Sequence, residues 1–220
     1  MNPLDQLGEA LAEVEELDGQ APGLPARVLS PQQAGEKDLA AAEHAAGEFL
    51  RALGMDLGAV HLQRTPARMA QAWAQMLTPR DFNFTTFPNE EHYDQLVVLR
   101  DIPVRPVCEH HLHPFAGRAC VGYLPGERSV GLSKLARIVE HFACRPQTQE
   151  RLTQQIADWL RKVLSPRAVG VVISAEHSCM SLRGANTPGT STVTSALLGH
   201  LRDNAGARQE FLSFSGLMNS

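Results

Sequence analysis

The sequence predicts an α+β fold built around antiparallel strands. Residues 94–107 and 115–125 read as neighbouring strands, and residues 168–182 and 190–199 form a second neighbouring pair. Two segments with helical periodicity lie between these pairs. Strands that follow one another in the chain can pair antiparallel, whereas strict alternation of strand and helix predicts a parallel sheet. The expected order is therefore helices, two strands, two helices, two strands and a last helix.

The N-terminal part of the chain is predicted to be helical. Residues 36–54 are rich in alanine, with apolar side chains at helical spacing and Gly54 where a C-terminal cap would lie. A second helix is expected to begin near Thr65, a good capping residue that Pro66 follows. The expected division is a mobile N-terminal segment at 1–33, a helical region at 34–80 and a larger α+β domain at 81–220.

The strand pairs are separated by two amphipathic helices. Residues 131–142 and 149–164 repeat apolar side chains every three or four positions, and Arg145 and Pro146 divide them. A last short helix is expected around residues 207–214. A small sheet covered by two helices leaves edge strands unpaired, so we expect copies of the chain to join their sheets in an oligomer.

Composition excludes several classes of protein. The 220 residues are 43% hydrophobic and 20% charged, which suffices for a packed core. The net charge of −4 argues against a protein that coats nucleic acid or an anionic membrane. The acidic N-terminus resembles no signal peptide and no long apolar run is present, so a cytoplasmic location is expected. The cysteines are expected to be thiols or metal ligands, with Cys120 and Cys144 as small buried side chains.

Two segments carry side chains that bind metals. The stretch CEHHLHPF contains Cys108 and His111, and EHSCM contains Cys179, which we expect on a strand with its side chain beside that of His177. Two thiolates and one imidazole would leave the fourth position of a zinc ion open, as in catalytic sites. Zinc lowers the pKa of its bound water toward about 7, so the set predicts a hydrolase.

Two histidines next to these ligands can transfer protons. Imidazole titrates near neutral pH, so His110 and His177 are candidate general acids or bases. The spacing does not assign their roles. His113 is the member of the cluster least expected to take part, and Glu109 is expected to make a structural hydrogen bond.

A site for phosphate is predicted at the start of the first central helix. Ser133, Lys134 and Arg137 lie on its first turns, where free N–H groups and the helix dipole favour anions. A solvated basic face explains these three residues equally well. Arg183, shortly after Cys179, and Arg68, in the N-terminal helices, are further candidate cations.

Taken together, these motifs resemble the GTP cyclohydrolase I family. The segments CEHH, GLSKLARIVE, RPQTQERLTQQI, EHSCMSLRG and STVTSALLG are similar to family signatures and occur in the same order, and the resemblance runs from about residue 39 to about residue 212. It implies zinc held by Cys108, His111 and Cys179. It also implies that His110 protonates the purine N7 and that His177 assists later proton transfers.

The resemblance implies further roles in binding GTP. Glu150 would recognise the guanine edge with Gln149 beside it, because a carboxylate can accept hydrogen bonds from N1–H and the 2-amino group together. The alternative is that the negative charge of Glu150 only stabilises the N-terminal end of the helix through the helix dipole. The residues that would contact the triphosphate are Ser133, Lys134, Arg137, Arg183 and, from a neighbouring subunit, Arg68.

The resemblance also implies the reaction and the assembly. The enzyme would open the imidazole ring of GTP, release formate and form 7,8-dihydroneopterin triphosphate, the first step of folate and pterin synthesis. Residues 81–220 would adopt the tunnelling fold, with sheets joined between subunits in a toroidal decamer, a dimer of pentamers. Two alternatives remain: a catalytically silent zinc- and nucleotide-binding regulatory homologue, and a relative that acts on another pterin or deazapurine.

Overall fold

The structure is a computed structural model that describes residues 26–28 and 37–216. The chain divides into two compact units, one formed by Pro31–Thr78 and the other by Met1–Ser30 together with Pro79–Ser220. The mobile segment expected at residues 1–33 lies outside the described residues, except for 26–28. Among the described helices, none combines the length and the apolar character needed to cross a bilayer.

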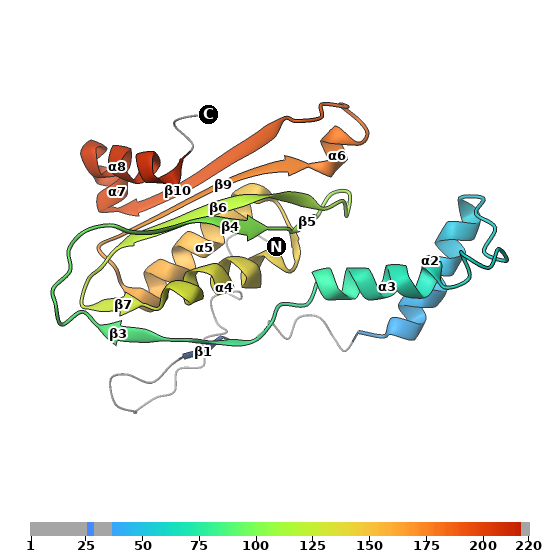
Figure 1. Ribbon diagram of the computed structural model, residues 1–220, viewed down its shortest axis with the longest axis horizontal. Helices are drawn as coiled ribbons and strands as arrows, with labels where there is room; N and C mark the ends of the chain where they lie inside the picture. Colours follow the sequence, from blue (N-terminus) through green and yellow to red (C-terminus); the bar gives the residue numbers. More distant parts are fainter. Residues whose placement is uncertain (1–25, 29–36, 217–220) are drawn as a thin grey trace, which may run out of the picture. The chain divides into compact units, whose positions relative to one another are not determined.

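The smaller unit is a pair of helices, α2 (Leu39–Ala52) and α3 (Thr65–Met76) (Figure 1). Asp38 caps α2 because its side chain accepts a hydrogen bond from the Ala41 N–H at 2.9 Å. Gly54 follows the helix with a φ of 83°, a left-handed conformation that glycine adopts without strain. Thr65 was expected as the cap of α3, but it is already helical and Arg64 takes the cap position.

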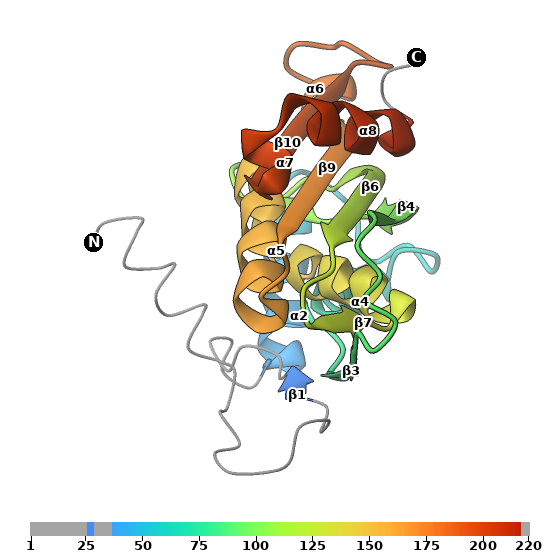
Figure 2. The same cartoon turned by 90° about the vertical axis from the view of Figure 1, so that its left-hand side faces the viewer.

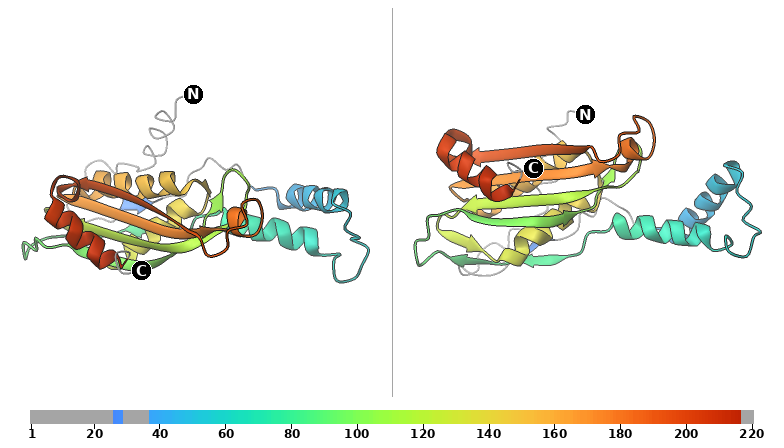
Figure 3. Two further views of the ribbon diagram at one scale, coloured as in Figure 1. Left: turned by 90° about the horizontal axis from the view of Figure 1, so that it is seen from above. Right: turned by 45° about the horizontal axis from the view of Figure 1, so that its top comes forward.

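The larger unit contains a four-stranded antiparallel sheet in the order β10-β9-β6-β4, which Figure 3 shows as four adjacent strands. The mixed α+β class with antiparallel pairing is confirmed. Each of the four strands lies within a predicted strand segment. The last predicted pair differs in one respect: β9 ends at His177, whereas the predicted strand ran to residue 182. The strands are β4 (Val97–Val104), β6 (Phe115–Leu124), β9 (Ala168–His177) and β10 (Ser191–Gly199).

Helices cover both faces of this sheet (Figure 2). On one face, α4 (Leu132–Ala143) packs over β4, and α5 (Gln149–Leu164) packs over β9 and β10. Their apolar stripes meet the inward side chains of the strands in the main core. On the other face lie α7 (His200–Asp203) and α8 (Ala205–Ser215), the predicted last helix.

Two glycines let α8 approach the sheet closely. Phe211 on α8 is fully buried over β6 and β9. A Cβ atom added to Gly170 would lie 2.6 Å from Phe211 Cε1, and one added to Gly122 would lie 2.9 Å from Phe211 Cε2. The absence of a side chain at these two positions is therefore what makes room for the phenylalanine ring.

Short strands complete the larger unit. They form three two-stranded sheets, β1–β2, β3–β7 and β5–β8, of which only β5–β8 is parallel. The parallel pair matters for the site because it places Cys108 opposite Gln147. The bounds are β1 (Ala26–Val28), β2 (Phe82–Phe84), β3 (Thr86–Pro88), β5 (Val107–Cys108), β7 (Arg128–Val130) and β8 (Pro146–Gln147).

Candidate metal centre

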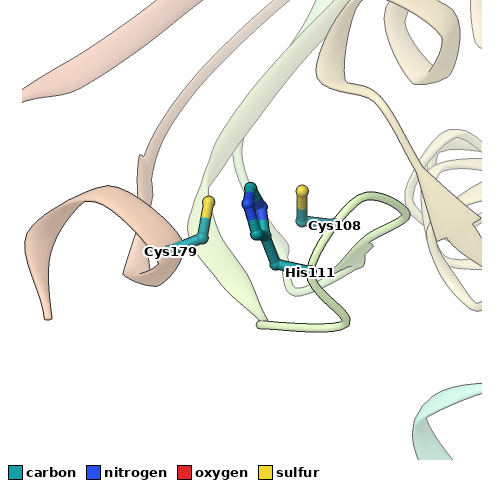
Figure 4. Close-up of side chains that lie close together, drawn as sticks. All are labelled: Cys108, His111 and Cys179. Atoms are coloured by element: carbon teal, nitrogen blue, oxygen red, sulfur yellow. The ribbon is translucent and has the colours of Figure 1, made fainter. Parts of the chain in front are cut away.

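Three side chains converge at one end of the sheet. Cys108 ends β5, His111 lies in the turn that follows, and Cys179 lies on α6 (Ser178–Ser181). Their ligand atoms all lie within 4.8 Å of one another. Figure 4 shows the His111 ring between the two sulfur atoms. The structure thus brings together the three residues that sequence spacing selected as a metal site.

Backbone hydrogen bonds fold the turn after Cys108 so that His111 returns to the thiol. The Cys108 N–H donates to the His113 carbonyl at 2.8 Å, and the Leu112 N–H donates to the Cys108 carbonyl at 2.8 Å. Leu112 takes a positive φ of 52° to close the turn. His113 therefore contributes its carbonyl oxygen to the turn, and its side chain is not a member of the metal-binding group.

Cys179 reaches the site from a helical turn rather than from a strand. The expectation that His177 and Cys179 share one strand is wrong, because β9 ends at His177 and α6 begins at Ser178. Ser178 fastens this turn to the metal-binding loop, since its N–H and its hydroxyl both donate to the Pro114 carbonyl, at 3.3 and 2.5 Å. The helical turn, and not strand alternation, presents the thiol.

The donor set suits a thiophilic cation. Burial raises the pKa of the Cys179 thiol above its ordinary value of 9.0, and the nearby Cys108 thiol raises it further. Two thiols this close resist losing both protons unless a cation offsets the negative charge. Cys120, in contrast, is buried in the sheet core on the α8 side, and burial raises its pKa to about 11. Cys120 and Cys144 are not members of the metal-binding group.

His177 is held in a fixed orientation beside the metal-binding group. Its ring stacks on Phe115, with 4.3 Å between centroids and 8° between planes. Its Nε2 lies 2.9 Å from Gln149 Oε1. Burial lowers the pKa of His177, while the negative charge of Glu150 opposes this shift. The neutral imidazole is thereby favoured.

The amide of Gln149 determines which His177 nitrogen carries the proton. Gln149 Nε2 lies 3.0 Å from the Ile173 carbonyl, 2.9 Å from the Thr192 carbonyl and 3.2 Å from Thr194 Oγ1. The two carbonyl oxygens can only accept, so they require the amide NH₂ on that side, and the amide oxygen faces His177. His177 Nε2 must then donate, which leaves Nδ1 unprotonated in the neutral ring.

His110 and Glu109 complete the metal-binding loop. His110 Nδ1 lies 3.8 Å from Cys108 Sγ, and its Nε2 lies 3.8 Å from Glu109 Oε1. Glu109 also accepts a hydrogen bond from Arg151 on α5. The expected structural hydrogen bond of Glu109 is therefore present. Sequence reasoning missed Arg151, because a cation on an amphipathic helix carries no local signal of a distant partner.

The residues predicted to contact the triphosphate are not members of the metal-binding group. Ser133 and Arg137 are exposed on α4 and Lys134 is half-buried; no hydrogen bond joins them to the metal-binding group among the described contacts. Arg183 lies near enough to Cys179 to lower the pKa of its thiol, an effect smaller than that of burial. Arg68 lies on α3 in the smaller unit, where its Nη2 donates to the His61 carbonyl at 3.1 Å.

Comparison with known proteins identifies the family. The family model described as GTP cyclohydrolase I matches residues 42–216. A GTP cyclohydrolase 1 of Mycolicibacterium paratuberculosis is 50% identical over 80% of this chain and 88% of its own length. The corresponding values are 48%, 82% and 92% for the protein of Streptomyces coelicolor, and 47%, 74% and 89% for that of Aquifex aeolicus. The chain belongs to the GTP cyclohydrolase I family.

Proposed function

We propose that this protein hydrolyses the imidazole ring of GTP, releases formate and forms 7,8-dihydroneopterin triphosphate. The observation that carries the proposal is the Cys108–His111–Cys179 group with a histidine beside each half, in a chain of this family. Retention of both His110 and His177 favours an active enzyme over a silent nucleotide-binding homologue.

Zinc is the metal that the donor set fits best. Cys108, His111 and Cys179 would hold it, because thiolate and imidazole are its usual protein ligands. When bound, zinc supplies Lewis acidity and lowers the pKa of water. The three ligands leave room in a four-coordinate site for a group that is not part of the protein.

The two histidines would move protons at different stages of the reaction. His110 would donate to the purine N7 from its exposed imidazole, whose Nδ1 faces the Cys108 sulfur. His177 would accept a proton at Nδ1, because Gln149 holds its Nε2 in the donor state. The lowered pKa of His177 keeps that nitrogen free to accept at neutral pH.

GTP would be positioned by one carboxylate and several cations. Glu150, in the first turn of α5, lies near enough to His177 to influence its pKa, which suits a residue that holds the guanine edge with Gln149 beside it. The triphosphate would meet Ser133, Lys134 and Arg137 at the start of α4 and Arg183 after α6. Arg68 would reach it from a neighbouring copy.

We further propose a tunnelling fold that assembles as a toroidal decamer of two pentamers. Support comes from the sheet edges: β4 and β10 each have only one partner strand within the described sheet. Pairing between copies would satisfy their backbone groups. Family membership also leads us to propose a cytoplasmic location.

A turnover assay tests the proposed reaction. Purified protein loaded with zinc is incubated with GTP, and formate and pterin absorbance are measured together. The two products are expected in equal amounts, and Cys179→Ser should lose zinc and turnover together. Competition by guanosine and by GTP analogues separates a GTP enzyme from one that uses a purine without phosphates. A zinc-loaded, folded protein that releases no formate from GTP contradicts the proposal.

A further inference from the structure

We propose that Arg151 is a positioning residue that holds the metal-binding loop in its ligating conformation. The proposal rests on the proposed function only in taking Cys108, His111 and Cys179 as zinc ligands. Arg151 itself touches none of the three. It acts through Glu109 and Gln147, which flank the site on two adjoining segments.

The guanidinium of Arg151 joins three groups around the loop. Its Nη2 donates to Glu109 Oε2, the residue next to Cys108, and also to the Pro146 carbonyl at 2.8 Å. Its Nε donates to Gln147 Oε1 at 2.9 Å. A planar guanidinium can serve several acceptors in fixed directions, which a lysine ammonium cannot reproduce. Arg151 thus fixes the relative position of β8 and the residue after Cys108.

Gln147 anchors this arrangement in the core. It is fully buried, and its Nε2 donates to the Phe142 carbonyl at 2.8 Å and to Gln155 Oε1 at 2.9 Å. The backbone carbonyl of Gln147 accepts a hydrogen bond from the Glu109 N–H at 3.0 Å. Cys108 pairs with Gln147 in the parallel β5–β8 ladder. The backbone around Cys108 is therefore tied through Gln147 to the last turn of α4 and to the side of α5.

The first turn of α5 supports both halves of the site. Gln149 holds His177, and Arg151, two residues later, holds Glu109. Thr148 caps this turn, because its hydroxyl accepts from the Arg151 N–H at 3.2 Å. The ion pair between Arg151 and Glu109 occupies the Glu109 carboxylate, whose oxygens are potential metal ligands next to Cys108. Arg151 thereby also favours a donor set of two sulfurs and one nitrogen.

Zinc affinity in single and double variants tests the proposal. Arg151→Met and Glu109→Gln are each expected to weaken zinc binding by about 10- to 100-fold, the usual effect of removing a group that orients metal ligands. The double variant should bind zinc no more weakly than the weaker-binding single variant, because both changes disrupt the same Arg151–Glu109 pair. Affinity is measured by competition with a chromophoric chelator. The cobalt-substituted proteins should show altered thiolate-to-cobalt absorption.

Arg161→Met is the matched control. It removes an arginine–carboxylate pair of the same helix, the 2.9 Å contact to Asp158, away from the loop. Its zinc affinity and cobalt spectrum should equal those of the wild type. Thermal unfolding of the metal-free proteins separates positioning from folding. Arg151→Met should melt below Arg161→Met, because the buried Gln147 Oε1 loses its donor, whereas Glu109→Gln should melt close to Arg161→Met.

Several results overturn the proposal. Unchanged zinc affinity in both Arg151→Met and Glu109→Gln would do so, as would losses that add in the double variant. A zinc loss in Glu109→Gln that is matched by equal destabilisation of its metal-free form assigns the Arg151–Glu109 pair to general stability instead. A wild type that binds zinc tightly but does not turn over GTP contradicts the proposed function and leaves the positioning role intact.

Discussion

The imidazole of His177 lies parallel to the ring of Phe115, with 4.3 Å between the centroids. The two residues are also partners in the β6–β9 ladder. Phe115 begins β6 directly after the metal-binding loop, and His177 ends β9 directly before the turn that carries Cys179. Stacking on a fully buried ring therefore orients the histidine and connects it with both ligand segments.

Replacing Gln149 with methionine should impair proton transfer by His177. The variant keeps the length of the side chain but removes the acceptor for Nε2–H, so the favoured tautomer is lost. We expect kcat to fall by about 10²-fold, within the usual contribution of general acid–base catalysis. The free energy of unfolding should fall by about 1–3 kcal/mol, because two backbone carbonyls lose a donor.

Gln154→Met is the control for this prediction. Gln154 is exposed on the same helix, where it contacts Asp158 at 2.8 Å. Its replacement should leave kcat and stability close to those of the wild type. Steady-state kinetics with GTP and urea unfolding measure both effects; a Gln149→Met enzyme with wild-type kcat would show that the hydrogen bond does not orient the histidine for catalysis.

Zinc binding should release protons. Because the pKa of Cys179 is raised, its thiol is protonated at neutral pH and must lose its proton to bind metal. We expect zinc binding to release protons, including the one on Cys179, and zinc affinity to rise with pH. Calorimetry in buffers of different ionisation enthalpy counts the protons. Release of no protons would mean that the thiols are not the ligands. In a separate experiment, chelation of zinc should abolish turnover reversibly.

Gly170→Ala should destabilise the protein by about 1–3 kcal/mol, the usual cost of overpacking. The new methyl group would lie 2.6 Å from Phe211 Cε1, too close for a van der Waals contact. In a Phe211→Leu background the same change should cost less, because the ring is absent. Gly47→Ala on α2 is the control, since its methyl group would meet neighbours at 3.4 Å and beyond. Equal effects of Gly170→Ala in both backgrounds would rule out the steric explanation.

The protein should lose stability as the pH falls from about 6.5 to about 4. His141 is 4% exposed, its Nδ1 has no hydrogen-bond partner, and burial lowers its pKa from 6.5 to about 4. Between these values the unfolded chain binds the proton and the folded protein does not, so stability falls by up to about 1.4 kcal/mol per pH unit. His141→Leu should flatten this dependence. Urea unfolding at several pH values measures this pH dependence. If the free energy of unfolding of His141→Leu changes with pH as steeply as that of the wild type, His141 is not its cause.

Local patterns in the sequence predicted most of the fold and the three side chains that converge at the candidate metal centre. Apolar periodicity sufficed for α4 and α5, and the spacing of Cys108 and His111 sufficed to pair two of these three side chains. The turn at Ser178 was missed because residues 168–182 read as one apolar strand. At the point where β9 ends, Ser178 donates to the carbonyl of Pro114, which lies far away in the chain. A window of neighbouring residues carries no such information.

The supporting residues were harder to predict than the ligands. Gln149 was expected beside the substrate, and its role there stays a prediction; the structure places its amide against His177 and two strands. Arg151 resembles any cation on a helix until the fold brings Glu109 to it. Ligands are recognised by their own chemistry, whereas their supports are defined by tertiary contacts.

The pairing of Phe115 with His177 would make a metal bound at the candidate centre a reporter of correct folding. β6 and β9 are aligned along their full lengths, from Phe115 opposite His177 to Leu124 opposite Ala168. A slip of two residues between these strands would preserve their inward and outward faces, yet it would shift one ligand segment past the other by about 7 Å. A misaligned sheet could bury its apolar residues and still fail to retain the ion. Retention of a metal by the Cys108–His111–Cys179 group would therefore distinguish the native strand alignment from a compact, misfolded alternative.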